Sequence, residues 1–318
     1  MIRYILACLI LPWLAACSSS NKPAEQGSVV ADSTYQPLYA RGFKIDYIKG
    51  QRLITVSDPF DSLRAPQTIC VLSRLDEKPV THADQTVCFE NPRWITLSST
   101  HISPASWLDI KGSIVGVAEP HYISDPLIQK NIEQGRIRNV GMAMAPDLEV
   151  VIAVKPTFVM VSPFPDINYS QIRNAGIAVV PNASYLENTP LARAEWLVFV
   201  AALFGKEPQA IQLFKDIAFR YNQLKNANTA IAHKPSLFTG NFYQGVWYAS
   251  KGQNYMATYF ADAGADYIYK NVEGTGTLNL EFEKNPSRCP PDRILVVDIE
   301  PSGRRDIRRG ETNRFTVR

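Results

Sequence analysis

Short apolar runs that alternate with helical stretches dominate the chain from Arg93 onward. Four runs have the β-branched composition of buried strands, and they begin at Trp94, Ser113, Phe158 and Ile177. Strands separated by helices pair in parallel, because the chain must cross back before each new strand starts. Residues 147–154, which end before Lys155-Pro156, predict a short helix that leads into one of these strands. The pattern therefore predicts an α/β fold with a parallel sheet.

The region before these runs has a different pattern. Residues 36–90 alternate apolar and polar positions, as in Phe43-Lys44-Ile45 and Leu53-Ile54-Thr55. Such alternation is typical of short antiparallel strands with one buried face. We therefore expect a β-rich N-terminal extension over residues 36–92.

The longest helical pattern covers residues 189–228. Thr189 and Pro190 form a typical helix start, while Gly205 and Pro208 interrupt the pattern. A helix of this length between two βα regions can join two lobes as a spine. Two ordinary helices of one domain, packed through an aromatic stripe, would give the same periodicity.

The N-terminus has the features of a bacterial lipoprotein signal. Arg3 precedes a short apolar run that ends in Leu14-Ala15-Ala16-Cys17, and Ser18 to Ser20 follow. We expect cleavage before Cys17, lipidation of Cys17 and a polar tether over residues 18–35. An ordinary secretory signal with a chance cysteine is the alternative. The lipid would place the protein in the periplasm of the cell envelope, anchored to a membrane through Cys17.

Composition limits the classes of partner. The chain has 318 residues, 20% of them charged, and a formal net charge of +3. Lys and Arg form no stripe interleaved with aromatic residues, so we expect no nucleic-acid partner. No second segment reaches the length of about 20 apolar residues that a membrane-spanning helix needs. We expect a monomer that contacts the membrane through its lipid alone.

Three cysteines remain after the leader, and they form no metal-binding motif. Cys70 and Cys88 lie in two expected strands, and Cys289 lies near the C-terminus. A disulfide between Cys70 and Cys88 is conceivable in an oxidising compartment. Two unpaired buried thiols are an equally good interpretation.

Several motifs between residues 94 and 283 occur in the order of one known family. They are residues 95–98, 114–117, 146–149, 153–156, 185–196, 204–207, 247–248, 252–257 and 262–267. This part of the chain resembles the periplasmic binding proteins for ferric siderophores, haem and cobalamin. The resemblance implies two Rossmann-like lobes joined by a single long helix, over residues 93–188, 189–228 and 229–283. A ligand would be held in the cleft between the lobes and delivered to the permease of an ABC importer.

The resemblance also implies which residues contact the permease. Glu149 occupies the docking position of the first lobe, and Glu281 is the best match on the second. Carboxylates there would pair with basic residues of the permease and orient the encounter. Without the resemblance, each would be interpreted as a solvated carboxylate at a helix start.

Loops at the carboxyl ends of the strands should line the cleft. The candidate ligand-binding residues on them are His101, His121, Tyr122, Tyr243 and Trp247. Aromatic faces suit a large flat or catecholate ligand, and Tyr or His could coordinate an exposed ferric centre. The expected ligand is an iron(III)-siderophore or a related metal chelate, with haem or cobalamin as alternatives. We expect no resident cofactor and no metal site defined by a motif.

Catalysis is not expected. The chain lacks a Gly-x-Ser-x-Gly elbow, a phosphate-binding Gly-rich Lys motif and a His-Glu-x-x-His helix. A lipid-anchored hydrolase on the same two lobes is one alternative. A lipoprotein that sequesters the iron ligand without transport is another.

The C-terminus departs from the family pattern. Residues 284–318 include Cys289-Pro290-Pro291 and an Arg-rich stretch, and they lack the expected alternation of strands and helices. We hypothesise a frameshift near Lys284, which would leave the second lobe incomplete, and sequencing of the locus tests this. In the alternative interpretation the tail is genuine and Ile294 to Ile299 supply one strand.

Overall fold

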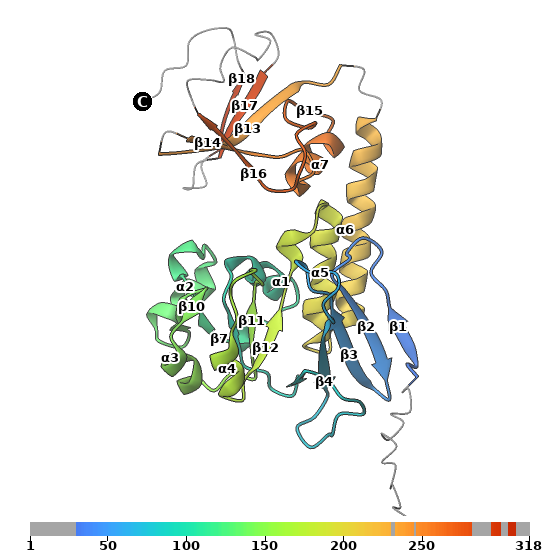
Figure 1. Ribbon diagram of the computed structural model, residues 1–318, viewed down its shortest axis with the longest axis vertical. Helices are drawn as coiled ribbons and strands as arrows, with labels where there is room; N and C mark the ends of the chain where they lie inside the picture. Colours follow the sequence, from blue (N-terminus) through green and yellow to red (C-terminus); the bar gives the residue numbers. More distant parts are fainter. Residues whose placement is uncertain (1–29, 230–232, 245, 282–293, 300–304, 310–318) are drawn as a thin grey trace, which may run out of the picture. The chain divides into compact units, whose positions relative to one another are not determined.

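The computed structural model describes residues 30–229, 233–244, 246–281, 294–299 and 305–309, and Figure 1 shows its ribbon. Three sheets of five or more strands organise this part of the chain, and β9 (Gly141–Met142) and β10 (Ala145–Pro146) form a further two-stranded sheet. The first has the strand order β1-β2-β3-β4-β5, the second β12-β11-β6-β7-β8, and the third β16-β14-β13-β17-β18 with β15 beside β13. None of the helices described is long and apolar enough to cross a membrane.

The N-terminal sheet begins earlier than the sequence suggests. Its strands are β1 (Ser33–Tyr35), β2 (Phe43–Ile48), β3 (Gln51–Val56), β4 (Gln67–Leu72) and β5 (Gln85–Cys88). The strand β1 lies inside residues 18–35, which were predicted to be a tether. The pairs from β1 to β4 are antiparallel, as predicted, but β4 and β5 pair in parallel.

The second sheet is entirely parallel, which confirms the α/β prediction. Its strands are β6 (Trp94–Thr96), β7 (Ile114–Val117), β8 (Arg138–Asn139), β11 (Phe158–Val161) and β12 (Ala178–Pro181). The helices α1 (Ile102–Trp107), α2 (Pro126–Glu133), α3 (Leu148–Ala153) and α4 (Ser170–Asn174) connect them. Successive residues of β11 belong to different core clusters, Phe158 to one and Val159 to the other. Because both faces of the sheet are covered, its strands are apolar throughout.

Residues 189–228 contain two helices, so the prediction of one lobe-joining helix over this range is corrected. They are α5 (Pro190–Ala202) and α6 (Glu207–Asn228). Gly205 between them has φ +65°, and a Cβ there would lie 3.0 Å from the ring of Phe89. Thr189 caps α5, as predicted, because its Oγ1 accepts a hydrogen bond from the Ala192 amide. In the chain, the long helix α6 is followed by the first strand of the third sheet (Figure 1).

The third sheet is mixed. It contains β13 (Ser236–Tyr243), β14 (Val246–Ser250), β15 (Asp266–Tyr267), β16 (Thr277–Glu281), β17 (Ile294–Ile299) and β18 (Arg305–Arg309), with the helix α7 (Tyr255–Asp262) between β14 and β15. The strand β13 pairs in parallel with β15 and β17. The tail therefore supplies a strand at Ile294–Ile299, as the alternative to a frameshift proposed. Cys289 lies outside the described residues.

Two glutamates of the α5 region hold the N-terminal sheet against the helices. The Glu195 carboxylate, 1% exposed, accepts the amides of Leu38, Tyr39 and Ala40 at 2.7–2.8 Å. Oε1 of Glu187 accepts the amide of Gly42 at 3.1 Å and the indole N–H of Trp196 at 3.0 Å. Strands β1 to β3 accordingly lie beside α5 and α6 in Figure 1.

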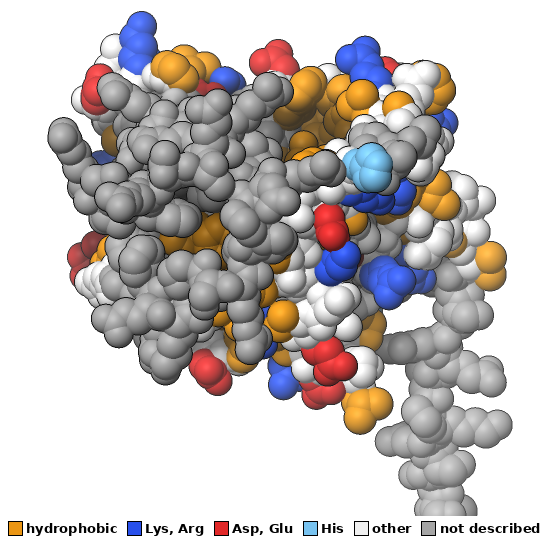
Figure 2. Space-filling view, turned by 90° about the horizontal axis from the view of Figure 1, so that it is seen from above, with side chains coloured by type: hydrophobic (Ala, Val, Ile, Leu, Met, Phe, Trp, Pro, Cys, Tyr) orange, Lys and Arg blue, Asp and Glu red, His pale blue; other side chains and the backbone are white. Residues whose placement is uncertain are grey.

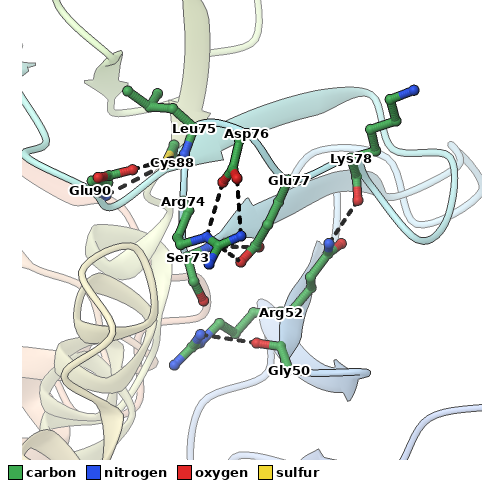
Figure 3. A network of polar contacts seen from close by, with 11 residues as sticks. Gly50, Arg52, Ser73, Arg74, Leu75, Asp76, Glu77, Lys78, Cys88 and Glu90 are labelled. Atoms are coloured by element: carbon green, nitrogen blue, oxygen red, sulfur yellow. Dashed lines mark hydrogen bonds and ion pairs between the residues drawn. The ribbon is translucent and has the colours of Figure 1, made fainter.

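Polar contacts order the loop between β4 and β5 (Figure 3). Arg74 donates to both carboxylate oxygens of Asp76 at 2.9 and 3.0 Å, and the Ser73 amide donates to Glu77 at 3.1 Å. Cys70 and Cys88 are buried and carry free thiols. Of the two interpretations of this cysteine pair, the structure therefore shows the unpaired one.

Acidic, basic and apolar side chains are interspersed on the face of the molecule drawn in Figure 2. The described side chains of this face form no continuous patch of one charge. This agrees with the small formal net charge of +3.

Candidate functional site

The carboxyl ends of β6, β7, β8, β11 and β12 lie at one edge of the second sheet, because these strands are parallel. Four turns begin there: η1 (Ser99–His101), η3 (Pro120–Tyr122), the hairpin of β9 (Gly141–Met142) and β10 (Ala145–Pro146), and η4 (Ser184–Leu186). Ligands of open α/β sheets bind at this edge. We call it the carboxyl edge.

His101 is a core residue rather than the exposed loop residue that the sequence suggests. Its side chain is 1% exposed. Its Nδ1 lies 3.0 Å from Oγ1 of Thr96, and its Nε2 lies 3.5 Å from Oγ of Ser162. Burial lowers the pKa of His101 to about 3, so the ring is neutral near pH 7. The neutral imidazole contacts the ends of β6 and β11 from inside the core, and in this way it supports the carboxyl edge.

His121 and Tyr122 are both exposed, as a ligand-binding role requires. Their ring centroids lie 4.0 Å apart, and the Tyr122 side chain is 68% exposed. The left-handed backbone of Glu119, with φ +47°, turns the chain sharply out of β7. The Gln129 side-chain amide donates to the Pro120 carbonyl at 2.8 Å and fixes the turn. The backbone is therefore held while both rings face solvent.

Two methionines beside this turn were missed from the sequence. Met142 and Met144 belong to the β9–β10 hairpin and are 62% and 53% exposed. The Glu119 amide donates to the Gly141 carbonyl at 3.0 Å and places the hairpin next to η3. Methionines are usually interpreted as core residues, so these two were not considered. Their alternation with Gly141 and Ala143 is a signal that could have indicated a short exposed hairpin.

Tyr243 and Trp247 come from the β13–β14 hairpin of the third sheet. Tyr243 is 59% exposed at the end of β13. Trp247 is half-buried, and its ring stacks on that of Phe238 with centroids 4.9 Å apart. A Cβ at Gly240 would lie 2.3 Å from Nε1 of Trp247, so the glycine makes room for the indole. Trp247 therefore contributes to packing as well as to the surface of the hairpin.

The two candidate docking glutamates differ in their local structure. Glu149 is exposed in the first turn of α3, where Oδ1 of Asp147 accepts the amides of Glu149 and Val150. Glu281 is the last residue of the strand β16, so a position at a helix start is wrong for it. Cys17, the candidate lipidation site, lies outside the described residues.

Within the described ranges, no group of three or more His, Cys, Asp or Glu side chains could hold a metal ion. The exposed candidates at the carboxyl edge are instead aromatic and thioether groups. Such groups bind ligands through apolar faces and through single donor atoms.

The family model of the periplasmic binding proteins matches residues 98–306, and these residues include α5, α6, most of the third sheet and the second sheet apart from β6. This chain is a periplasmic binding protein. The resemblance inferred from the motifs is thereby confirmed.

Two curated relatives of this periplasmic binding protein come from Methanocaldococcus jannaschii. An uncharacterized lipoprotein is 29% identical over 218 residues, which are 64% of this chain and 51% of the relative. An uncharacterized protein is 23% identical over 169 residues, 52% of this chain and 51% of the relative. The chain thus spans about half the length of the curated relatives that it matches.

Solved structures show the same fold. A periplasmic binding protein from Veillonella parvula has a TM-score of 0.57 at 16% identity, and the match covers 77% of each chain. The periplasmic heme binding protein HutB of Vibrio cholerae has a TM-score of 0.51 at 20% identity, covering 65% of this chain and 76% of HutB. The siderophore binding protein BauB, bound to acinetobactin and ferric iron, has a TM-score of 0.52 at 16% identity over 77% of each chain.

Proposed function

We propose that this periplasmic binding protein is the substrate-binding lipoprotein of an ABC importer and captures an iron(III)-siderophore or a related metal chelate. The family match over residues 98–306 carries the proposal. Solved proteins of this fold include a heme binding protein and a siderophore binding protein, so haem is an alternative ligand. The resemblance to the family adds cobalamin as a second alternative.

The proposed ligand contacts come from one turn and one hairpin. His121 and Tyr122 offer an exposed imidazole and phenol at the carboxyl edge. Tyr243 and Trp247 offer aromatic surface on the third sheet. Aromatic faces cover the organic part of a chelate, and a phenol or imidazole can reach the metal. In this proposal His101 positions the edge and does not contact the ligand.

The proposed anchor and docking residues lie elsewhere. Lipid on Cys17 would tether the protein to the envelope membrane, as in a lipoprotein. Glu149 on α3 and Glu281 on β16 would face basic residues of the permease. Opposite charges at such contacts accelerate encounter and set orientation more than they add affinity.

Ligand binding is tested by titrating the detergent-solubilised full-length protein with ferric siderophores, haemin and cobalamin in parallel. Trp247 stacks beside the proposed contacts, so its fluorescence should respond to a bound chelate. Saturable binding of one ligand supports the proposal and names the cargo. A folded protein that binds none of them contradicts it, and hydrolysis of a bound ligand would favour the hydrolase alternative.

Docking is tested by Glu149→Lys in cells that depend on import of the identified ligand. We expect uptake to fall at least tenfold while ligand binding in solution is unchanged, because the reversed charge repels the permease. Glu133→Lys, at an exposed glutamate that ends α2, is the matched control. Normal uptake by the Glu149 variant would contradict the docking role, and binding without any uptake would favour sequestration.

A further inference from the structure

The carboxyl edge carries an exposed apolar surface formed by His121, Tyr122, Met142 and Met144, which we call the methionine–aromatic patch. Its backbone is well fixed, because the Glu119 amide bonds to Gly141 and the Tyr169 hydroxyl donates to the Ala143 carbonyl at 3.2 Å. A ligand that covers large apolar side chains removes their surface from water, and this lowers the free energy of the complex. Methionine also adapts its shape to an irregular partner.

The charges around the patch are all of one sign. Five loops at this edge, residues 97–101, 118–125, 140–147, 162–169 and 182–189, contain no Lys or Arg. Their charged residues are Glu119, Asp125, Asp147, Asp166 and Glu187. Asp125 and Asp147 cap helices, and Glu187 holds Gly42 and Trp196. Asp125 is neutralised by its ion pair with Lys111, whose Nζ lies 2.8 Å away, but the other four contribute a negative field, which repels an anionic ligand.

Arg193 near these loops and Lys270 on the third sheet are already engaged. Arg193, in the first turn of α5, donates through Nε to the Glu187 carbonyl at 3.1 Å, and the Tyr255 ring lies 3.4 Å from its Cζ. On the third sheet, Lys270 pairs with Asp266.

We infer that the ligand is a metal chelate with an apolar face and a neutral or positive net charge, and that Met142 and Met144 contact it. This inference rests on the proposed function and deepens it. A polyanionic catecholate complex or a chelate with free carboxylates would meet five loops that carry negative charges and no Lys or Arg. An uncharged or cationic chelate with an apolar face matches both the charge and the surface of the patch.

The first test compares four probes by equilibrium dialysis against the detergent-solubilised full-length protein. Cyanocobalamin is neutral, ferrioxamine B is cationic, haemin carries two carboxylates, and a ferric tricatecholate is polyanionic. We expect one of the first two to bind at least tenfold more tightly than either of the others. Tighter binding of haemin or the tricatecholate overturns the charge inference and leaves the proposed function intact. Binding of none by a folded protein rejects the proposed function, and this inference with it.

The second test places charge in the patch. The double variant Met142→Lys, Met144→Lys should bind the preferred probe more weakly, on the order of tenfold. The ratio of its affinity for this probe to its affinity for the ferric tricatecholate should also fall. Ile152→Lys, at a 47% exposed position in the last turn of α3, is the control and should bind as the parent does. If circular dichroism shows that the lysine variant is unfolded, Met142→Gln with Met144→Gln replaces it. Unchanged affinity in the folded variant overturns the role of the two methionines.

Discussion

The Tyr35 hydroxyl donates a hydrogen bond to Oε1 of Glu195, with 2.9 Å between the oxygens, although 160 residues separate the two in the sequence. The same oxygen accepts the Leu38 amide, and Oε2 accepts the amides of Tyr39 and Ala40. Burial is the main cause of the raised pKa of Tyr35, followed by the charge of Glu195. One buried carboxylate thus binds the start of the N-terminal sheet to α5.

Replacement of Glu195 by Gln should destabilise the protein by about 1–3 kcal/mol. The new NH₂ group would face backbone N–H donors and leave them without an acceptor. Chemical denaturation measures the free energy of unfolding, and Glu133→Gln, at an exposed site, is the control. A loss of stability no greater than that of the control would show that the carboxylate is dispensable.

The ion pair of Arg52 and Glu207 should behave as a buried pair. Its Nε–Oε1 distance is 2.6 Å, and the side chains are 17% and 3% exposed. Arg52→Met would leave Glu207 charged and unpaired, at a cost of about 3–5 kcal/mol in the free energy of unfolding. Urea denaturation of the variant measures this loss.

The double variant Arg52→Met, Glu207→Leu is the control for that experiment. Because it removes both charges, it should recover most of the lost stability. A double variant as unstable as Arg52→Met alone would mean that packing of Arg52 on the Phe89 ring, 4.9 Å away, matters more than charge.

His101 should make the protein sensitive to acid. Its pKa is lowered by burial from 6.5 to about 3 in the fold, so the unfolded chain binds a proton that the folded protein does not. The stability from this residue is present above pH 6.5 and is lost as the pH falls toward 3, with a slope of up to about 1.4 kcal/mol per pH unit. Over this pH range, the free energy of unfolding should change less with pH for His101→Gln than for the parent. His121→Gln is the control for the loss of one histidine. The same pH dependence of the free energy of unfolding in His101→Gln and in the parent would contradict the prediction.

Gly205→Ala should destabilise the turn between α5 and α6 by about 1–2 kcal/mol. The φ of +65° is unfavourable for alanine, and its Cβ would crowd the Phe89 ring. Thermal unfolding compares this variant with Gly112→Ala, where a Cβ would have no neighbour within 4 Å. Equal melting temperatures would show that the turn relaxes freely.

Cys70 and Cys88 should react with iodoacetamide only after denaturation, and without any reductant. Both thiols are free and buried, and burial raises the pKa of Cys70, which further lowers the thiolate fraction. Peptide mapping of alkylated protein identifies the labelled residues. Label that appears only after reduction would instead reveal a disulfide.

Local patterns predicted those elements whose stability depends on nearby residues. The helix α3 lies within the predicted residues 147–154, and Thr189 caps α5 as its sequence position indicates. The parallel pairing of β5 was not predictable, because it depends on the path of residues 73–84 and not on the strand itself. The sequence indicated an interruption of the helical pattern at Gly205. It did not indicate that the chain there packs against Phe89, which lies far away in the sequence.

Candidate site residues were harder to place, because exposure depends on tertiary contacts. His101 follows three polar residues and resembles a loop residue, yet Thr96 and Ser162 enclose it. Met142 and Met144 resemble core residues and are exposed. Glu195 lies in an apolar helix, and its partners, 155 to 160 residues earlier, leave no local signal.

The Glu195 contacts also constrain the order of folding during synthesis. Residues 38–40 leave the ribosome about 155 residues before the carboxylate that binds their amides. At about 5–20 residues per second this is a wait on the order of ten seconds. Until then the N-terminal strands have no helix to cover their apolar face. A chaperone that binds exposed strands should therefore associate with nascent chains that end before residue 195 and be released from longer ones.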